Sequence, residues 1–456
     1  MSSTLQPSPV VQGAYPAREG NDVRILIDGH DAFGRIYELA AHARRSLWIT
    51  VSFVQLDLRL PGRDETFVEL VERLAASGVD VRLLFWWSEY QGIGSYRGDD
   101  HELQELATRG CRVRMRWDSV PRGCHHQKSY VIDGEIAFVG GINITREALS
   151  SAAHDAEGFH DVFAEIRGPA VEDVERNFVE RWNQATVTNE RGHAFPSLEE
   201  AGALDEEAIA PRPPAGNVRI QILRSVRHSL YRGIRGWTEA KFDLWNGEQA
   251  IRCAVLECIG AAREHLYVEN QFLMDPDTID ALAAAAARGV EVIAVLPRDP
   301  DPNLLLYPEE PMRQTRAALS RLGRHANVGL FGLVHDGETG RPIYVHAKLL
   351  VADDEVVLLG SANFWPPSYS RDSELNVLLW DRTIAADLRA RLWSEHLLGY
   401  EARDLDDWRR LERQARDARA AGRRPPARLV AIDADRYYVF PEGTAAPWQN
   451  VRESPS

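Results

Sequence analysis

Two stretches of the sequence repeat one pattern of polar residues: His126-Gln127-Lys128-Ser129-Tyr130-Val131-Ile132-Asp133 and His346-Ala347-Lys348-Leu349-Leu350-Val351-Ala352-Asp353. In both, the lysine follows the histidine by two positions and the aspartate follows the lysine by five. Each copy then reaches a small-residue step and an asparagine, in Gly140-Gly141-Ile142-Asn143 and in Gly360-Ser361-Ala362-Asn363. An internal repeat of this length predicts two homologous halves in one chain.

Each copy has the pattern of a β-hairpin. Side chains alternate along a strand, so the histidine and lysine of one copy lie on the same face. The apolar run that follows predicts a buried strand, and the aspartate begins a tight turn. We expect Asp133 and Asp353 to hold these turns rather than to contact a substrate. The glycine step then allows close backbone approach and returns Asn143 and Asn363 to the histidine edge.

The imidazole, ammonium and carboxamide of each copy suit a phosphate group. Lysine and asparagine donate hydrogen bonds to phosphoryl oxygens, and histidine attacks phosphorus or donates a proton near neutral pH. A single copy would be a weak signal, because a surface strand with a chance histidine gives the same pattern. The alternative for the pair is an old duplication whose site has decayed, but both halves retain every polar member.

This pattern resembles the signature of the phospholipase D superfamily, His-x-Lys-x4-Asp followed by Gly-Gly/Ser-x-Asn. The resemblance extends over roughly residues 21–400. It implies a phosphodiester-cleaving enzyme without a metal or other cofactor, whose single active site is shared between the halves. It also implies an α/β fold of two homologous α-β-α layered half-domains with mixed sheets, related by a pseudo-twofold axis.

The resemblance implies roles for the repeated residues. His126 is assigned as the nucleophile and His346 as the acid by family habit, since the sequence does not fix their order. Lys128, Lys348, Asn143 and Asn363 are expected to cradle the phosphoryl oxygens, beside Gly141 and Ser361.

Each histidine needs a carboxylate on its other ring nitrogen to fix its tautomer. Glu374 follows Asn363 by eleven residues, where the resembling family places such a carboxylate. The corresponding strand of the first half begins after Asp161, which makes Asp161 the equivalent residue. Asp155 is a competitor, because the first half carries an insertion at residues 149–158.

Other residues near the expected site have two interpretations. Trp86, Trp87, Phe272 and Tyr307 either pack in the core or line an apolar pocket, and Trp365, just after Asn363, is the better pocket candidate. His125 is expected to be a packed or surface residue, and Cys124 is not needed as a nucleophile.

The alternation of helical and strand patterns divides the chain into five segments. Residues 1–20 are predicted to be disordered, and residues 21–200 form the first half-domain. A Pro-rich linker at 201–216 leads to the second half-domain at 217–400. Residues 401–456 form an extension with a charged helix and a late strand over residues 428–440.

Composition limits the classes of function. The chain has 456 residues and a formal net charge of −15, which argues against non-specific binding to nucleic acid. Its four cysteines show no Cys-x-x-Cys spacing and do not predict a zinc site. The sequence has neither a secretory-signal pattern nor an apolar run long enough to span a bilayer. We expect a cytoplasmic monomer that contacts membranes only peripherally, because one chain supplies both halves of the site.

The resemblance favours cleavage of a glycerophospholipid, with transfer to an alcohol competing with hydrolysis. The segment Leu266-Tyr267-Val268-Glu269-Asn270-Gln271-Phe272-Leu273 is similar to a stretch of phospholipases D that act on phosphatidylcholine. The alternatives are cardiolipin synthesis by phosphatidyl transfer and a nuclease or small-molecule phosphodiesterase of the same superfamily. A non-catalytic binding module is disfavoured by the two intact signatures.

Overall fold

A computed structural model describes residues 11–87, 112–118, 123–154, 158–187, 194–228, 247–336, 340–441 and 443–444. The competitor Asp155 lies outside these ranges.

Each half contains a mixed sheet, and the pairing of the strands gives the two sheets the same strand order. In the first half the order is β4-β3-β2-β5-β6-β8-β1, and in the second it is β13-β12-β11-β15-β16-β17-β9. In both, the first three strands named are parallel and the other pairs are antiparallel. The duplicated α/β fold expected from the repeat is therefore confirmed.

The strands of the first sheet are β1 (Arg18–Ile27), β2 (Ser46–Val51), β3 (Asp80–Trp86), β4 (Arg114–Asp118), β5 (Ser129–Ile132), β6 (Ile136–Gly140) and β8 (Val162–Arg167). Those of the second are β9 (Val218–Val226), β11 (His265–Asn270), β12 (Glu291–Leu296), β13 (Val328–Val334), β15 (Lys348–Ala352), β16 (Val356–Gly360) and β17 (Glu374–Trp380). Shorter strands are β7 (Phe159–His160), β10 (Glu248–Gln249), β14 (Pro342–Val345) and β18 (Leu429–Ala431).

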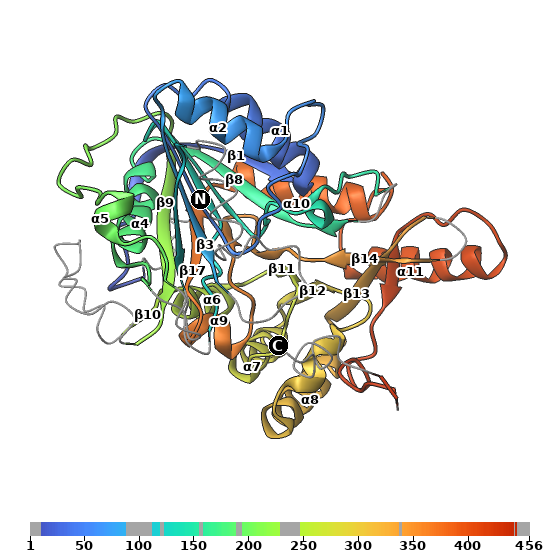
Figure 1. The fold of residues 1–456 in the computed structure, drawn as a ribbon. Helices are drawn as coiled ribbons and strands as arrows, with labels where there is room; N and C mark the ends of the chain where they lie inside the picture. Colours follow the sequence, from blue (N-terminus) through green and yellow to red (C-terminus); the bar gives the residue numbers. More distant parts are fainter. Residues whose placement is uncertain are drawn as a thin grey trace.

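Helices cover the outer face of each sheet. Helices α1 (Asp28–Ala40) and α2 (Phe67–Ala76) pack on the first sheet, at the top of Figure 1. Helices α6 (Ala250–Ala261), α7 (Pro276–Ala287) and α8 (Glu309–Gly323) pack on the second, below it. Shorter helices are α5 (Leu198–Ala201), α9 (Pro366–Ser370), and the 3-10 turns η1 (Arg146–Ala148) and η3 (Pro302–Leu306).

The inner faces of the two sheets share one hydrophobic core. Val131 of β5 and Val351 of β15 belong to the same buried cluster. This core also takes in α4 (Val171–Gln184), α10 (Arg382–His396) and α11 (Leu405–Ala420). Strands β6 and β8 contact β16 and β17 across it, and β1 pairs with both β8 and β9. The two halves therefore contact each other through β6 and β8 of the first sheet and β16 and β17 of the second.

Both hairpins turn on residues with positive φ. Asp133 and Gly134 have φ of 54° and 64°, and Asp353 and Asp354 have φ of 53° and 50°, as a type I′ turn requires. The Asp133 carboxylate accepts hydrogen bonds from the amides of Arg44, Arg45 and Ser46, at the start of β2. Asp353 accepts the equivalent bonds from Arg263, Glu264 and His265. These aspartates lie at the hairpin ends remote from the histidines.

Two segment predictions were wrong. Residues 11–20 are not disordered: Val11 and Tyr15 are 3% exposed, and the Gln221 side chain binds the backbone of both. They are ordered because Tyr15 packs in the core shared by the two sheets and Val11 packs in the cluster between the second sheet and its helices. The late strand predicted over residues 428–440 is limited to Leu429–Ala431, since the chain then turns to bury Tyr437 and Tyr438. The linker at 201–216 lies against the first half, where Arg212 pairs with Glu175 at 2.6 Å.

The C-terminal helix α11 is part of the core rather than an appendage. Trp408 is fully buried, with ring centroids 5.3 Å from those of Phe331 and Trp393. We expect Trp408→Ala to lower the free energy of unfolding by about 3–5 kcal/mol, because it leaves a large cavity. Arg413→Ala, at an exposed position of the same helix, should change it by less than about 0.5 kcal/mol. Denaturant unfolding of both variants measures this, and equal values would show that α11 packs only weakly.

Candidate active site

Each signature histidine sits on a segment that pairs with the other half of the chain. His125 forms a bridge with Ser373, and the His126 amide donates to the Ser373 carbonyl at 2.9 Å. On the other side, β14 pairs with β7, and the His346 amide donates to the His160 carbonyl at 2.8 Å. The residue after each pairing partner is a carboxylate, Glu374 or Asp161. Main-chain pairing thus delivers each histidine to a carboxylate of the opposite half.

The side chains complete this crossed arrangement. His126 Nδ1 lies 2.9 Å from Glu374 Oε2, and His346 Nδ1 lies 2.6 Å from Asp161 Oδ2. A proton held between Nδ1 and the carboxylate leaves Nε2 of each ring free for chemistry. Glu374 is fully buried and Asp161 is 1% exposed, whereas the side chains of His126 and His346 keep 16% and 9% exposure. Only the histidines therefore reach solvent.

Ser361 in the second half and Gly141 in the first occupy equivalent positions, and the carboxylates beside them explain why the two residues differ. Ser361 Oγ donates to Glu374 Oε2 at 2.6 Å. Gly141 holds the equivalent place, and a Cβ added there would meet Asp161 Oδ2 and Oδ1 at 2.5 and 2.6 Å. Asp161 is one methylene shorter than Glu374, so its carboxyl group occupies the space that the Ser361 side chain fills in the other half.

Both signature lysines are buried beside their histidines. Lys128 Nζ donates to Ser52 Oγ at 3.1 Å and to the His126 carbonyl at 2.7 Å. Lys348 Nζ donates to Gln271 Oε1 at 3.0 Å and to the His346 carbonyl. Burial lowers the pKa of Lys128 to about 8 and that of Lys348 to about 7, although nearby carboxylates act against it. The ammonium groups are thus held in a poorly solvated site that favours an incoming anion.

The imidazoles are also biased toward their neutral form. Burial lowers the pKa of His126, with Glu374 opposing the shift. Burial, and then the charges of Lys348, Lys128 and His126, holds the pKa of His346 well below its usual range. Burial also raises the pKa of Asp161 to about 7, against the charge of Lys348. The charges of one half therefore shift pKa values in the other half, because the structure brings the two signatures close together.

The two asparagines are held differently. Asn143 Oδ1 accepts from the amides of Ser52 and Phe53, both at 3.2 Å, which leaves its NH2 group to donate elsewhere. Asn363 Oδ1 is buried without a hydrogen-bond partner among the described residues. Asn270 instead accepts from the amides of Phe272 and Phe364, at 3.1 Å each. The second half therefore uses a strand-end asparagine for the task that Asn143 performs in the first.

Trp365 belongs to a half-buried aromatic cluster. Its ring centroid lies 5.0 Å from that of Phe272 and 5.8 Å from that of Tyr307, and its Nε1 donates to Ser368 Oγ at 2.8 Å. Trp86 packs against Phe53 at 5.5 Å, and Trp87 is 8% exposed beside Phe195. A role for Trp365 in binding substrate stays a prediction.

Two neighbours of the signatures are structural. His125 is fully buried against Thr50 and Arg181. The Cys124 thiol lies near Asp372, and burial together with that carboxylate raises its pKa well above the usual range. A thiol held in this form is a poor nucleophile.

Sequence reasoning missed Ser52 and Gln271, which accept hydrogen bonds from the two lysines. They occupy equivalent positions, just beyond β2 and β11, six residues after Ser46 and His265. Superposing the two halves residue by residue, beyond the signature itself, would have indicated both. Their side chains differ in type, so a search for identical residues in the two halves does not find them.

The tight packing of Gly141 on Asp161 predicts a specific sensitivity. We expect Gly141→Ala to lower the free energy of unfolding by about 1–3 kcal/mol and to displace Asp161, because the added methyl group overlaps the carboxylate. Gly34→Ala is the matched control, since a Cβ there meets nothing within 4 Å in helix α1 and should stabilise by about 0.5–1 kcal/mol. Thermal unfolding of both variants checks this, and an unperturbed Gly141→Ala protein would contradict the packing.

Comparison with known proteins gives consistent results. A family model described as "Cardiolipin synthase, PLD-like domain" matches residues 36–182 and 255–395, one segment in each half. A second, described as "Phospholipase D", matches residues 149–279. The chain is 27% identical over 386 residues to the major cardiolipin synthase ClsA of Bacillus subtilis (strain 168), covering 81% of this chain and 68% of that protein.

Two further similarities extend the picture. Phospholipase D A of Dictyostelium discoideum is 23% identical over 487 residues, covering 84% of this chain and 36% of that protein. The crystal structure of phosphatidylserine synthase from Haemophilus influenzae Rd KW20 aligns with a TM-score of 0.57 and 16% identity, covering 92% of this chain and 89% of that one. This last likeness concerns the fold. Because the cardiolipin synthase-like model matches more than half of the sequence, once in each half, the chain belongs to the phospholipase D superfamily.

Proposed function

We propose that this enzyme cleaves the phosphodiester of a glycerophospholipid and transfers the phosphatidyl group through a phosphohistidine to an alcohol or to water. The observation that carries this proposal is the crossed pair of histidines, each with Nδ1 on a carboxylate of the other half and each beside a buried lysine. Such an arrangement supplies both a nucleophile and a proton donor for one phosphorus atom.

In the first step His126 Nε2 attacks phosphorus and the P–O bond to the leaving group breaks. His346 Nε2–H donates its proton to the leaving oxygen. In the second step the acceptor hydroxyl loses its proton to His346 and attacks phosphorus, the P–N bond breaks, and His126 is restored. Lys128 and Lys348, with the NH2 group of Asn143, would donate to the phosphoryl oxygens as charge develops on them. Asn363 is proposed to bind the phosphoryl group on the side opposite Asn143.

The protonation states of the free site suit the nucleophile but not the acid. Both imidazoles have lowered pKa values, so both are mainly neutral at pH 7. A phosphodiester is an anion, and its charge beside His346 favours the protonated ring. Substrate binding would therefore complete the acid–base pair by proton uptake.

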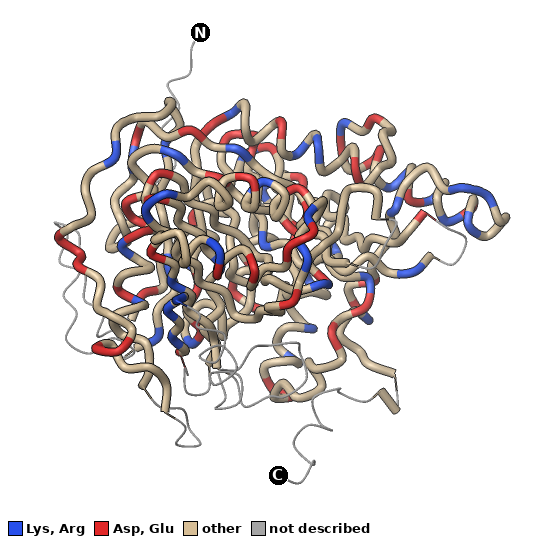
Figure 2. Tube along the Cα trace, turned by 45° about the horizontal axis from the view of Figure 1, so that its top comes forward, with Lys and Arg blue, Asp and Glu red and all other residues tan. Residues whose placement is uncertain are grey.

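A lipid substrate is favoured over a nucleic acid. The named relatives are a cardiolipin synthase and a phospholipase D, and the aromatic cluster at Trp365 offers an apolar surface for acyl chains. Basic and acidic residues are interspersed along the chain (Figure 2), and the net charge is −15. A cardiolipin synthase-type reaction differs only in the acceptor, which is then the glycerol hydroxyl of a second phospholipid.

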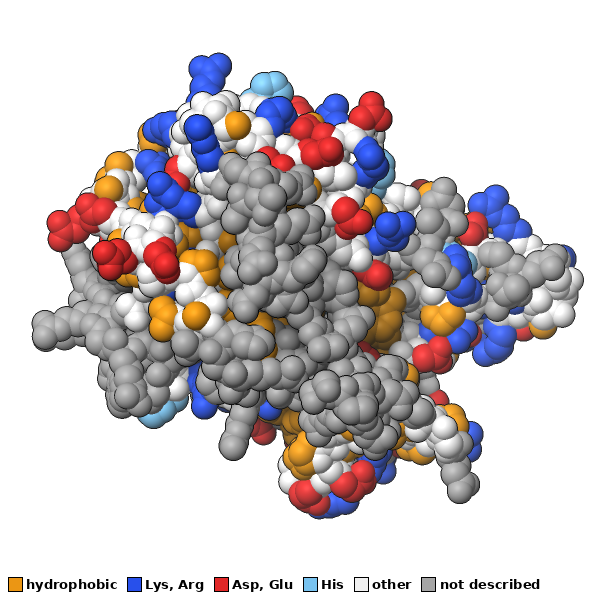
Figure 3. Space-filling view, in the orientation of Figure 1, with side chains coloured by type: hydrophobic (Ala, Val, Ile, Leu, Met, Phe, Trp, Pro, Cys, Tyr) orange, Lys and Arg blue, Asp and Glu red, His pale blue; other side chains and the backbone are white. Residues whose placement is uncertain are grey.

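Contact with the membrane would be peripheral. Among the described helices, none combines the length and apolar character needed to cross a bilayer. Figure 3 shows side chains of both charges over the top of the molecule and at the end formed by α11. Arg410 of α11 pairs with Asp407 at 2.8 Å, and Arg409 lies 3.6 Å from Asp406, which fits a solvated helix face.

A substrate panel tests the reaction class. Phosphatidylcholine, phosphatidylglycerol, a single-stranded oligonucleotide and an aryl phosphodiester are offered to the parent and to His126→Ala and His346→Ala. We expect turnover of a lipid, lowered about 10²–10⁴-fold or more in each variant, with His42→Ala as an exposed control of parental activity. Oligonucleotide cleavage that exceeds lipid turnover and needs both histidines would identify a nuclease instead.

Trapping distinguishes the roles of the histidines. Rapid quenching in alkali, which preserves phosphohistidine, should leave labelled phosphoryl group on one histidine of the parent. We expect this label on His126, and its complete absence in His126→Ala. Label on His346 would reverse the assignment, and no label in any protein would exclude the covalent route.

Proton uptake on anion binding follows from the direction of the pKa shifts. Sulfate, which does not titrate near neutrality, should bind more tightly as the pH falls from 8 to 6, because it raises the depressed pKa values of His346 and Lys348. Calorimetry in buffers of different ionisation enthalpy measures the protons taken up. We expect His346→Ala to take up fewer protons than the parent when sulfate binds. A sulfate affinity of the parent that does not change with pH would contradict the proposed charge balance.

A further inference from the structure

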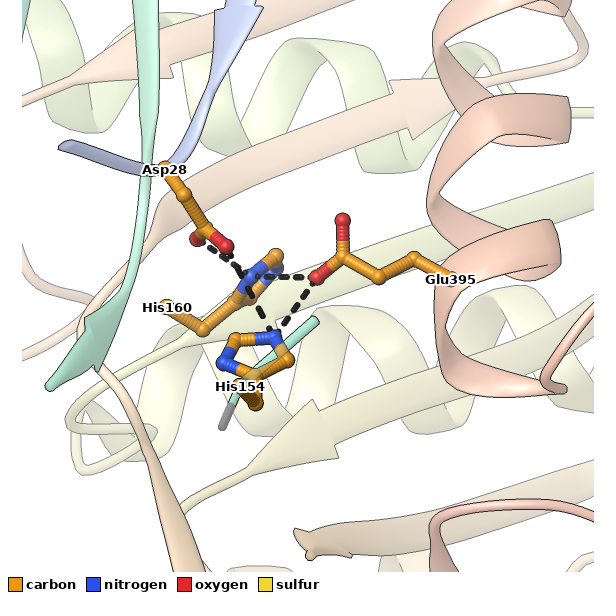
Figure 4. A group of neighbouring side chains, drawn as sticks. All are labelled: Asp28, His154, His160 and Glu395. Atoms are coloured by element: carbon orange, nitrogen blue, oxygen red, sulfur yellow. Dashed lines mark hydrogen bonds and ion pairs between the residues drawn. The ribbon is translucent and has the colours of Figure 1, made fainter. Parts of the chain in front are cut away.

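A second polar cluster is buried behind the His346 side of the site. It consists of Asp28 at the start of α1, His154 in the loop before β7, His160 on β7, and Glu395 near the end of α10; we call it the four-residue cluster. Figure 4 shows the four side chains pointing toward one another from these separate elements. Exposure of each side chain is 5% or less. None of the four is used in the proposed reaction.

The distances within the cluster match those between the ligands of a tetrahedral metal ion. Glu395 Oε1 lies 2.9 Å from His154 Nε2 and 3.1 Å from His160 Nδ1. Asp28 completes the group through Oδ2, which lies 3.6 Å from His154 Nε2. One ligand atom from each of the four residues lies within 4.8 Å of the others. Zinc–ligand bonds of about 2.0–2.2 Å place tetrahedral neighbours about 3.3 Å apart, in the middle of this range.

Both histidines have the outer partner that metal-bound histidines need. His160 Nε2 lies 2.9 Å from Glu269 Oε2, and His154 Nδ1 lies 3.0 Å from Ser150 Oγ. A proton on each outer nitrogen leaves the lone pair of the inner nitrogen directed into the cluster. Carboxylate and hydroxyl partners of this kind fix the tautomer and strengthen the ligand.

The cluster also contains a buried carboxylate with one unsatisfied oxygen. Asp28 is fully buried, and its Oδ2 has no hydrogen-bond partner among the described residues. The Arg428 guanidinium lies close enough for the charges of Glu395 and Asp28 to influence it, but it donates to the carbonyls of Ala152, Ala153 and Glu395. A buried carboxylate oxygen without a donor is costly, and a bound cation removes that cost.

We propose that Asp28, His154, His160 and Glu395 bind one divalent transition-metal ion, of which Zn²⁺ best fits two imidazoles and two carboxylates. Four protein ligands fill a tetrahedral shell, so the ion has no open position for a reacting group. Its effect would be structural. The two carboxylates balance its charge, and no other anion is needed.

The ion would position one half of the active site. The His160 carbonyl accepts from the amides of His346 at 2.8 Å and Ala347 at 3.0 Å. Asp28 Oδ1 accepts from the Asp161 amide at 3.2 Å, and the Asp28 amide donates to the Asp161 carbonyl at 2.8 Å. Two of the proposed ligands, Asp28 and His160, therefore form hydrogen bonds with the backbone of the His346–Asp161 pair. Glu395 belongs to the second half and contacts His154 and His160 of the first half. Metal binding itself does not depend on the proposed reaction.

The competing interpretation is a metal-free network in which His160 carries protons on both nitrogens. It would then be a buried cation between Glu269 on one side and Asp28 and Glu395 on the other. That network also explains the short contacts. It leaves Asp28 Oδ2 without a donor, however, and it predicts no affinity for metal.

Elemental analysis separates the two interpretations. Untagged protein, incubated with Zn²⁺ and then desalted, should retain about one zinc per chain by mass spectrometry. Stripping with a strong chelator should lower the melting temperature, and adding Zn²⁺ should restore it. Replacement by Co²⁺ should produce the intense visible absorption of tetrahedral cobalt. Parent protein that holds no zinc, with a melting temperature unaffected by chelator or by Zn²⁺, would overturn the proposal.

Variants then assign the ion to these residues. His154→Ala and Glu395→Gln should each abolish stoichiometric zinc, whereas His42→Ala, an exposed histidine outside the cluster, should retain it. Ser150→Ala removes only an outer partner and should weaken zinc binding by about 10-fold. Zinc retained equally by His154→Ala and Glu395→Gln would place the ion elsewhere and overturn the assignment. If either variant fails to fold, the cobalt spectrum and zinc-dependent melting of the parent still decide the matter.

Discussion

The candidate active site depends on one constraint, that each buried imidazole takes its carboxylate from the other half of the chain. An unpaired carboxylate in this interior would be costly, and each of the two has its partner across the boundary. The main chain enforces this exchange, because the strand segments at His125 and Val345 pair with the residues just before Glu374 and Asp161. Neither half can complete its own histidine. The shared core between the two sheets follows from the same arrangement.

The pseudo-twofold relation is broken at residues for which the proposed reaction needs two different groups. Glu374 is supported by Ser361, whereas Asp161 packs on Gly141. The lysine of the first half is held by Ser52 and that of the second by Gln271, and their pKa values fall to about 8 and about 7. A nucleophile and an acid require different electrostatic surroundings, so duplicated signatures with unlike neighbours can serve one asymmetric reaction.

The sequence predicted what is local and what is repeated. The hairpins and the turn aspartates follow from short-range patterns. Glu374 was predicted from its spacing after Asn363 and the family resemblance, and Asp161 from the equivalent position before a predicted strand. The crossing of the pairs was not predictable, because it depends on how the two sheets face each other. The same limit applies to Asp28, His154, His160 and Glu395, whose positions in the chain give no metal-binding spacing. Residues 11–20 are ordered because they pack on Gln221, a contact between residues about 200 positions apart in the sequence. A contact of this range could not be predicted from local patterns.

Burial accounts for the protonation states of the candidate site when no substrate is bound. Desolvation lowers the pKa values of both histidines and both lysines, and it raises that of Asp161. The empty site therefore tends toward neutral groups, which a buried environment tolerates best. A phosphodiester brings the negative charge that makes protonated lysine and histidine favourable there. On this argument the substrate's own charge generates the general acid, and a neutral ligand of similar shape would leave both imidazoles unprotonated.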